Sequence, residues 1–330
     1  MVRDTRHHVR WGVLERPGSQ KGWMLLTRLK HFFVHHSNRL IIAEGGTTMA
    51  QQIFLNVAQC TDVGRKRQVN EDSMISIVPE DPQVMAKKGA LFVVADGLGG
   101  RAAGDIASEM AVSAMSTTYY RNEDEDVAAS LLQAVQRANA LIYQRATENA
   151  VWNGMGTTCV AAVLQGGMAY IANVGDSRAY IARDGHIKQV SQDHSWVAEQ
   201  VRVGSLTEEA ARAHPQRNVI YRCLGEKADV EVDLFSEQVQ EGDLLVLCTD
   251  GLSNQVSDEE LREIVQRFGP RESVYHLIEQ ANQNGGPDNI TTIVVRVSPG
   301  QRRELQTSPS TSYERAVMAQ VKRMEEMGEK

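Results

Sequence analysis

No apolar run in the sequence reaches the roughly 18 to 20 residues that a membrane-spanning helix needs. The N-terminus is basic, with Arg3, Arg6 and Arg10, but it lacks the compact apolar stretch and the small-residue cleavage site of a secretory signal. Both absences argue against a membrane protein and against export by that route. The sequence therefore predicts a soluble, cytoplasmic protein with no membrane partner.

Cysteine pairs and a surplus of positive charge are also missing. The four cysteines lie far apart and form no Cys-x-x-Cys pair, which argues against a zinc site and against a disulfide framework. The formal net charge is −7, so the chain lacks the excess of Lys and Arg that would neutralise nucleic-acid phosphates. We expect reduced thiols and no nucleic-acid partner.

What is present is the composition of an ordinary globular protein, with 330 residues of which 42% are hydrophobic and 23% charged. Residues 1–48 show no periodicity and are expected to be a poorly ordered extension. Residues 53–297 are expected to form one domain, and residues 298–330 a linker and charged tail. A purine-rich run resembling a ribosome-binding site can encode Glu44-Gly45-Gly46, which suggests that Met49 is the true start.

Short β-type runs between turn signals predict most of the domain's structure. Strands are expected at 53–60, 73–78, 90–95, 158–164, 168–174, 178–182, 230–235, 244–249 and 290–297. Helices are expected at 106–119, 127–148, from 257 onward and at 271–282, and a polar helical flap at 194–203 and 207–213. Tight turns at Gly166-Gly167 and Asp184-Gly185 favour antiparallel neighbours, which argues against a doubly wound nucleotide-binding fold.

Acidic residues stand at the ends of several expected strands. Asp96 and Asp250 each follow an apolar run and precede Gly, whereas Asp176 and Asp288 lie in the turns Gly-Asp-Ser and Gly-Pro-Asp-Asn. Each alone is most often a turn residue. Together they predict an oxygen-rich site for hard divalent cations, and Mg2+ or Mn2+ is favoured over zinc because no His or Cys accompanies them.

The ordered set of motifs resembles the type 2C, or PPM, family of metal-dependent protein serine/threonine phosphatases over residues 53–297. The motifs lie at 64–72, 94–100, 156–158, 173–178, 192–195, 214–218, 248–252 and 286–289. The resemblance implies an α+β fold, a four-layer α-β-β-α sandwich in which helices flank two antiparallel sheets. It also implies two Mn2+ or Mg2+ ions at one end of the sandwich.

The resemblance also assigns roles to individual residues. Asp96 would bridge the two metals, and the other ligands would be the Gly97 carbonyl, Asp250, Asp288 and, directly or through water, Glu71 and Asp72. Asp176 matches the aspartate that helps bacterial members hold a third, weaker metal. Arg67 matches the arginine that binds the substrate phosphate, for which a guanidinium fork is well suited.

The implied reaction is direct hydrolysis of phosphoserine or phosphothreonine by a metal-bridging water, without a covalent phosphoenzyme. Many eukaryotic members have His at the position of Leu98, so the leucine indicates a bacterial member. Leaving-group protonation would then fall to a metal-bound water, with His194 and His214 as weaker candidates. The expected partners are phosphorylated proteins, including a Ser/Thr kinase and its substrates, and the enzyme is expected to be a monomer.

Two other functions remain open from the sequence. One is a non-catalytic phosphoprotein-binding module, which would typically have lost the metal aspartates, and the other is a phosphatase acting on a small metabolite. The glycine-rich stretch Gly97–Gly104 lacks the Gly-Lys-Ser/Thr ending of a nucleotide loop, so it favours a ligand loop that leads into a helix.

Overall fold

The computed structural model describes residues 34–42, 51–98 and 103–299, which form two packed antiparallel sheets. The first sheet has the order β1 (Val34–Ile42), β2 (Gln51–Asp62), β12 (Ile290–Pro299), β11 (Leu244–Cys248), β8 (Arg178–Arg183), β9 (His186–Gln189). The second has the order β10 (Asp233–Gln238), β7 (Met168–Val174), β6 (Cys159–Gln165), β4 (Ala90–Leu98), β3 (Asp72–Ile77), with β5 (Gly156–Thr157) paired to β4.

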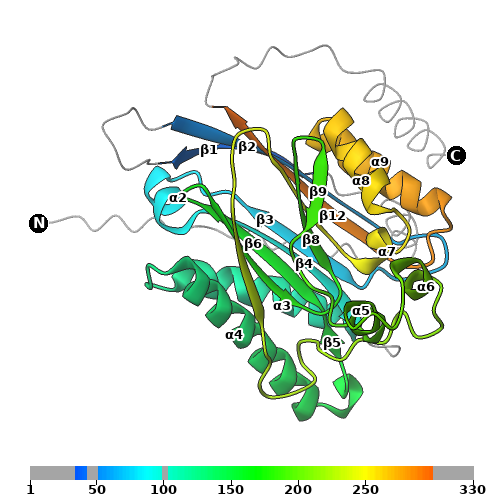
Figure 1. Ribbon diagram of the computed structural model, residues 1–330. Coiled ribbons are helices and arrows are strands. Elements are labelled where there is room, and N and C mark those ends of the chain that lie inside the picture. Colours follow the sequence, from blue (N-terminus) through cyan, green and yellow to red (C-terminus); the bar gives the residue numbers. More distant parts are fainter. Residues whose placement is uncertain (1–33, 43–50, 99–102, 300–330) are drawn as a thin grey trace, which may run out of the picture.

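Helix pairs cover the outer faces of both sheets (Figure 1). α3 (Gly104–Arg121) and α4 (Val127–Glu148) pack on the second sheet, and α8 (Asp258–Arg267) and α9 (Pro270–Gln283) pack on the first. The Asp126 carboxylate caps α4, and Ser257 and Glu260 form a capping box at the start of α8. The predicted four-layer α-β-β-α sandwich is confirmed.

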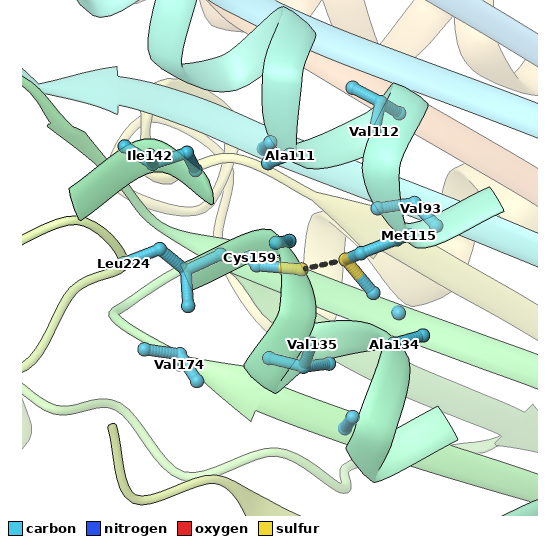
Figure 2. Close-up of a cluster of buried hydrophobic side chains, with 14 of the residues drawn as sticks. Val93, Ala111, Val112, Met115, Ala134, Val135, Ile142, Cys159, Val174 and Leu224 are labelled. Carbon is cyan, nitrogen blue, oxygen red and sulfur yellow. Dashed lines mark hydrogen bonds between the residues drawn. The ribbon is translucent and has the colours of Figure 1, made fainter. Parts of the chain in front are cut away.

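Apolar side chains fill the three spaces between these four layers. Phe92, Ile171 and Leu247 belong to the cluster between the two sheets, and each is fully buried. Figure 2 shows part of the cluster under α3 and α4, where the Cys159 Sγ lies 3.2 Å from the Met115 Sδ. Burying each such side chain contributes roughly 1.5 to 3 kcal/mol. The strands that lead to the acidic residues are therefore held rigidly.

The expected strands and helices are present, with ends that differ by a few residues. Both expected tight turns join neighbouring antiparallel strands, β6 to β7 and β8 to β9. Gly166 and Gly167, like Asp184 and Gly185, have positive φ angles, which suit a two-residue hairpin. The sequence missed α2 (Pro82–Lys88), which begins at an Asp81 cap, and the short edge strand β9. No helix in the described ranges is long and apolar enough to cross a membrane.

The N-terminal region differs from the expectation at one segment. Residues 34–42, which the sequence placed in a poorly ordered extension, form strand β1 along β2, with Val34 opposite Gln59 and Ile42 opposite Gln51. Backbone pairing with β2, rather than a hydrophobic pattern, defines this strand. Residues 1–33 and 43–48 of the extension, and 300–330 of the tail, lie outside the described residues. A start at Met49 stays a prediction, and the intact mass of the natively expressed protein tests it.

The predicted flap also forms, between Ser195 and Ile220, which pair with each other in an isolated antiparallel bridge. It contains the short helices α5 (Trp196–Arg202) and α6 (Glu208–Arg212), which are capped by Ser195 and Thr207. It lies at the end of the sandwich where β11 leads into α7 (Asp250–Ser253) (Figure 1). A short 3-10 helix, Ala150–Trp152, follows α4 on the way to β5.

Candidate active site

The alternation of side chains along β4 directs Asp96 toward the space between the sheets. Phe92 and Val94 belong to the central cluster, so Asp96 continues the same face by the two-residue period of a strand. Asp72 lies directly opposite Asp96 in the β3–β4 pairing. The two carboxylates therefore share the inner face of the second sheet at one end of the sandwich.

The first sheet places two threonines against Asp72. Thr249 and Thr291 continue the inward faces of β11 and β12. Thr291 Oγ1 donates to Asp72 Oδ2 at 2.6 Å and Thr249 Oγ1 donates to the same oxygen at 3.0 Å. The other oxygen, Asp72 Oδ1, is buried without a hydrogen-bond partner. Burial raises the pKa of Asp72 from 3.8 to about 7, despite the opposing effect of the threonine hydroxyls.

Close backbone packing brings Asp250 and Asp288 to the same end. A Cβ on Gly251 would lie within 3.0 Å of the Asn289 carbonyl, so only glycine fits after Asp250. The Asn289 side chain accepts from the Glu71 N–H at 2.9 Å and donates to the carbonyls of Val63 and Val69, at 3.0 Å each. Asn289 thereby joins the segment that carries Asp288 to the loop that carries Glu71.

That loop also delivers Arg67 to the site. The Arg67 Nη2 donates to Asp288 Oδ2 at 2.9 Å, although 221 residues separate the two in the sequence. The Arg67 side chain is 48% exposed, so its remaining N–H groups face solvent at the mouth of the site. A surface pair of this kind contributes little to stability, at most about 1 kcal/mol. Its geometry instead places a guanidinium beside the carboxylates.

Asp176 approaches from the turn between β7 and β8. Its neighbour Arg178 forms a forked pair with Asp193, through Nε at 3.0 Å and Nη2 at 2.7 Å to Asp193 Oδ2. Burial and then the charge of Asp250 raise the pKa of Asp176. A cavity of about 350 Å³ lies between this turn, Asp250 and the flap, with Val197 and Arg217 among the flap residues that line it. The flap therefore borders the acidic site.

Burial, and after it mutual repulsion, raises the pKa values of the carboxyl groups in the site. Burial and then the charges of Asp72 and Asp250 raise the pKa of Asp96, while burial and the Asp288 charge raise that of Asp250 to about 6. Burial also raises the pKa of Glu71. Carboxylates packed against like charges in this way are stabilised by cations. The donor set is all oxygen, which suits Mg2+ or Mn2+, and the unpartnered Asp72 Oδ1 is a ready acceptor for such an ion or its water.

The carboxylates lie near one another, but they are not already arranged as a cation site. Among the described residues, no three or more His, Cys, Asp or Glu side chains form a cluster that could hold a metal ion as they stand. The carboxylates instead have polar partners: Asp72 the two threonines, Asp250 the Asn254 amide at 3.1 Å and the Asp96 carboxyl, and Asp288 the Arg67 guanidinium. Cation binding would exchange these partners. When two ions share a carboxylate, and a carbonyl and waters supply other ligands, each ion needs fewer side chains from the protein.

The structure brings the predicted site residues to one end of the molecule. Asp96 interacts electrostatically with four other aspartates, Asp72, Asp250, Asp176 and Asp288. Glu71 interacts in the same way with Arg67 and Asp288. Gly97 donates its N–H to the Glu71 carbonyl at 3.2 Å, beside these groups. The sequence missed the supporting residues Thr249, Thr291 and Asn289. Thr249 directly precedes Asp250, Asn289 directly follows Asp288, and Thr291 is the second residue of the last expected strand. These positions were the signal that could have found them.

Comparison with known proteins agrees with this geometry. The family model described as Protein phosphatase 2C matches residues 65–293. A Listeria innocua protein named serine/threonine phosphatase stp is 40% identical over 240 residues, covering 71% of this chain and 93% of that protein. The crystal structure of the Mycobacterium tuberculosis serine/threonine phosphatase PstP/Ppp has a TM-score of 0.66 and 37% identity, covering 74% of this chain and 99% of that one.

A further solved structure, the catalytic domain of the phosphatase PstP, contains two manganese ions. It has a TM-score of 0.65 and 35% identity, and the match covers 74% of this chain and 99% of that one. The matched part of the chain contains every predicted ligand, from Glu71 to Asp288. This chain belongs to the protein phosphatase 2C family.

Proposed function

We propose that the protein is a metal-dependent phosphatase that hydrolyses phosphoserine and phosphothreonine in proteins. The observation that supports this most is the convergence of Asp72, Asp96, Asp250 and Asp288 from distant segments around an unpartnered, buried carboxylate oxygen. The Arg67 guanidinium lies beside them, in reach of Asp288. A non-catalytic binding module would not need this repulsive carboxylate cluster.

The proposed cofactors are two Mn2+ or Mg2+ ions. Asp96 would contact both, the Gly97 carbonyl and Asp250 and Asp288 would complete the protein ligands, and Glu71 and Asp72 would bind directly or through water. Asp176 would help to hold a third, weaker ion. When bound, the cations supply positive charge to the phosphoryl oxygens and lower the pKa of the attacking water.

The chain's own residues would bind and orient the substrate. Arg67 would hold two phosphate oxygens with its free N–H groups, and Asp288 would fix the direction of the guanidinium through the bond at 2.9 Å. Thr249 and Thr291 would keep Asp72 Oδ1 turned toward the site by occupying Oδ2. Attack by water would be direct, with no covalent phosphoenzyme.

Histidine does not supply the leaving-group proton in this proposal. His194 is buried, and the structure engages both of its ring nitrogens. The His214 ring lies 4.8 Å from the Trp196 ring inside the flap, and its Nδ1 accepts from the Gln216 N–H. Leu98 cannot carry a proton. The departing oxygen would therefore be protonated by water.

The cellular setting is also a proposal. We infer a monomer that acts in the cytoplasm on phosphorylated proteins, including a Ser/Thr kinase and its substrates. The four cysteines are free thiols, and Cys60, Cys159 and Cys248 are buried, which fits a reducing compartment.

The proposed activity is tested by hydrolysis of an aryl phosphate with Mn2+. We expect turnover that a chelator abolishes and that added Mn2+ restores, because the carboxylates alone repel a phosphate dianion. Failure to hydrolyse any phosphomonoester would favour the binding module. Competition between phosphopeptides and small phosphorylated metabolites then separates the two substrate classes, and preference for metabolites would contradict a protein phosphatase.

Substitution of Arg67 tests the proposed phosphate contact. Arg67→Ala is expected to raise KM for a phosphopeptide about 10-fold, since one charge-assisted contact contributes about 1.5 to 3 kcal/mol. Inhibition by inorganic phosphate should weaken in parallel. Lys66→Ala removes a neighbouring exposed charge and is the matched control. Equal effects of the two substitutions would show that only general surface charge matters.

A further inference from the structure

The two ends of the flap are paired with each other, residues 194–196 with residues 219–221. Ser195 and Ile220 form an isolated antiparallel bridge, and the Trp196 N–H donates to the Val219 carbonyl at 2.8 Å. The Tyr221 N–H then donates to the His194 carbonyl at 3.0 Å. The segment between these points contains α5 and α6. Any displacement of the flap as a unit therefore acts on the backbone at His194.

The main chain and the side chain of His194 both bind Gly175, the residue before Asp176. The His194 N–H donates to the Gly175 carbonyl at 2.9 Å, and the Gly175 N–H donates to His194 Nδ1 at 2.9 Å. Because Nδ1 accepts from a backbone N–H, it carries no proton, and the burial of the imidazole, which is only 3% exposed, lowers its pKa in agreement. The proton must then lie on Nε2.

The Nε2 side of the ring faces Asp233, the first residue of β10, and Arg222, which follows the flap in the sequence. His194 Nε2 lies 3.2 Å from Asp233 Oδ2 and donates to it. Arg222 Nη1 lies 2.9 Å from the same Nε2, but it donates to Asp233 Oδ1 at 2.7 Å, because a protonated nitrogen cannot accept. Arg222 Nη2 donates to Glu231 Oε2 at 2.6 Å. The ring thus spans the gap between Gly175 and the segment at 222–233.

Gly175 has little freedom to absorb a shift of the ring. Its φ is +111°, a conformation that favours glycine, and a Cβ there would lie within 3.0 Å of the Thr158 side chain. On the other side, Asn173 Nδ2 donates to the Gly175 carbonyl at 3.2 Å. Asp176 follows directly and lines the same cavity as the flap residues Val197 and Arg217. The imidazole is therefore linked to Asp176 through a single residue, Gly175.

We propose that His194 is a positioning residue that couples the flap to Asp176, so that the flap's position over a bound phosphoprotein sets the position of the Asp176 carboxylate beside Asp250. The coupling rests on the proposed function, in which Asp176 is a cation ligand and the flap borders the substrate. Simple packing would need only an apolar side chain of the same size. The buried ring instead makes a separate hydrogen bond on each side, one to the Asp176 turn and one to Asp233, which also binds Arg222 at the end of the flap.

Two substitutions separate these bonds. In His194→Asn, the amide oxygen takes the place of Nδ1 and keeps the Gly175 contact, while the contact with Asp233 is lost. In His194→Gln, the longer side chain reaches the place of Nε2 and keeps the Asp233 contact, while the Gly175 N–H loses its acceptor. The full-length protein is titrated with Mn2+ by calorimetry, and KM is measured for a phosphopeptide and for a small aryl phosphate.

His194→Gln is expected to weaken the lowest-affinity Mn2+ site by about 10-fold, the lower end of the range for residues that support a ligand. His194→Asn should leave the Mn2+ titration unchanged and raise KM for the phosphopeptide, but not for the aryl phosphate, which is too small to reach the flap. Asp233→Ala, on the edge strand β10, should repeat the His194→Asn result and replaces that variant if it fails to fold.

Identical Mn2+ titrations and identical KM ratios in all three variants would overturn the coupling and leave His194 a packing residue. The wild-type protein is measured in parallel. If it binds no Mn2+ or hydrolyses no phosphomonoester, the proposed function itself fails. If it does both and the variants do not separate, only the coupling fails.

Discussion

Asp96→Asn is expected to lower kcat by about three orders of magnitude, the largest effect of any single substitution in the site. Metal sites of this kind contribute several kcal/mol of transition-state stabilisation, and each 1.4 kcal/mol is about tenfold in rate. Burial, and then the charges of Asp72, Asp250, Asp176 and Asp288 together, raise the pKa of Asp96. Neutralising it removes the group at the centre of the cluster.

Calorimetry with Mn2+ gives a readout that does not depend on turnover. Asp96→Asn should lose most of the heat of tight binding, yet the protein should stay folded. The main chain at residue 96 keeps its bonds to Thr157 and Thr158, and the substitution relieves repulsion between buried carboxylates. Unchanged Mn2+ affinity in this variant would contradict the proposed ligand set.

Asp126→Asn is the matched control for this experiment. It makes the same chemical change at the start of α4, where the Asp126 carboxylate accepts from the Ala129 N–H. Asparagine caps helices about as well as aspartate, so stability, Mn2+ binding and kcat should all stay at the wild-type values. A loss of activity in both variants would show that the loss of one negative charge from the protein, wherever it lies, is the cause.

The resemblance to the type 2C family predicted the four-layer fold, whereas the placement of aspartates at strand ends has a physical reason of its own. A strand alternates its side chains with a period of two, so an aspartate at the end of a buried strand continues either the inner or the outer face. In β4 the fully buried run from Ala90 to Ala95 leads to Asp96. Glycine after an aspartate indicates close backbone packing, as the short distance from Gly251 to the Asn289 carbonyl illustrates.

Other features could not be predicted, because they depend on which distant groups meet. Threonine is common in strands, so nothing in the sequence marks Thr249 and Thr291 as donors to Asp72. The pairing of Arg67 with Asp288 joins positions 221 residues apart. His194 was only a secondary candidate for leaving-group protonation, and its burial and its two bonded ring nitrogens suggest a positioning role instead.

The same buried carboxylates give the metal-free protein an unusual dependence of stability on pH. Burial raises the pKa of Asp72 from 3.8 to about 7 and that of Asp250 from 3.8 to about 6, and it also raises that of Asp96. A carboxyl group with a raised folded-state pKa binds its proton more tightly in the folded than in the unfolded protein. Its stabilising contribution is complete below pH 3.8 and is lost as the pH rises through the folded-state value.

In chelator, we therefore expect the free energy of unfolding to be lower at pH 7.5 than at pH 5.5, by on the order of 2 to 4 kcal/mol. His194 acts in the opposite sense, since burial lowers its pKa, but it is one group against several aspartates. Urea denaturation at the two pH values measures the difference. Saturating Mn2+ at pH 7.5 should reverse the loss, because cations offset the same repulsion, and Asp96→Asn should reduce the pH dependence. Greater stability at pH 7.5 in chelator would show that the carboxylates do not repel one another strongly enough to create a cation site.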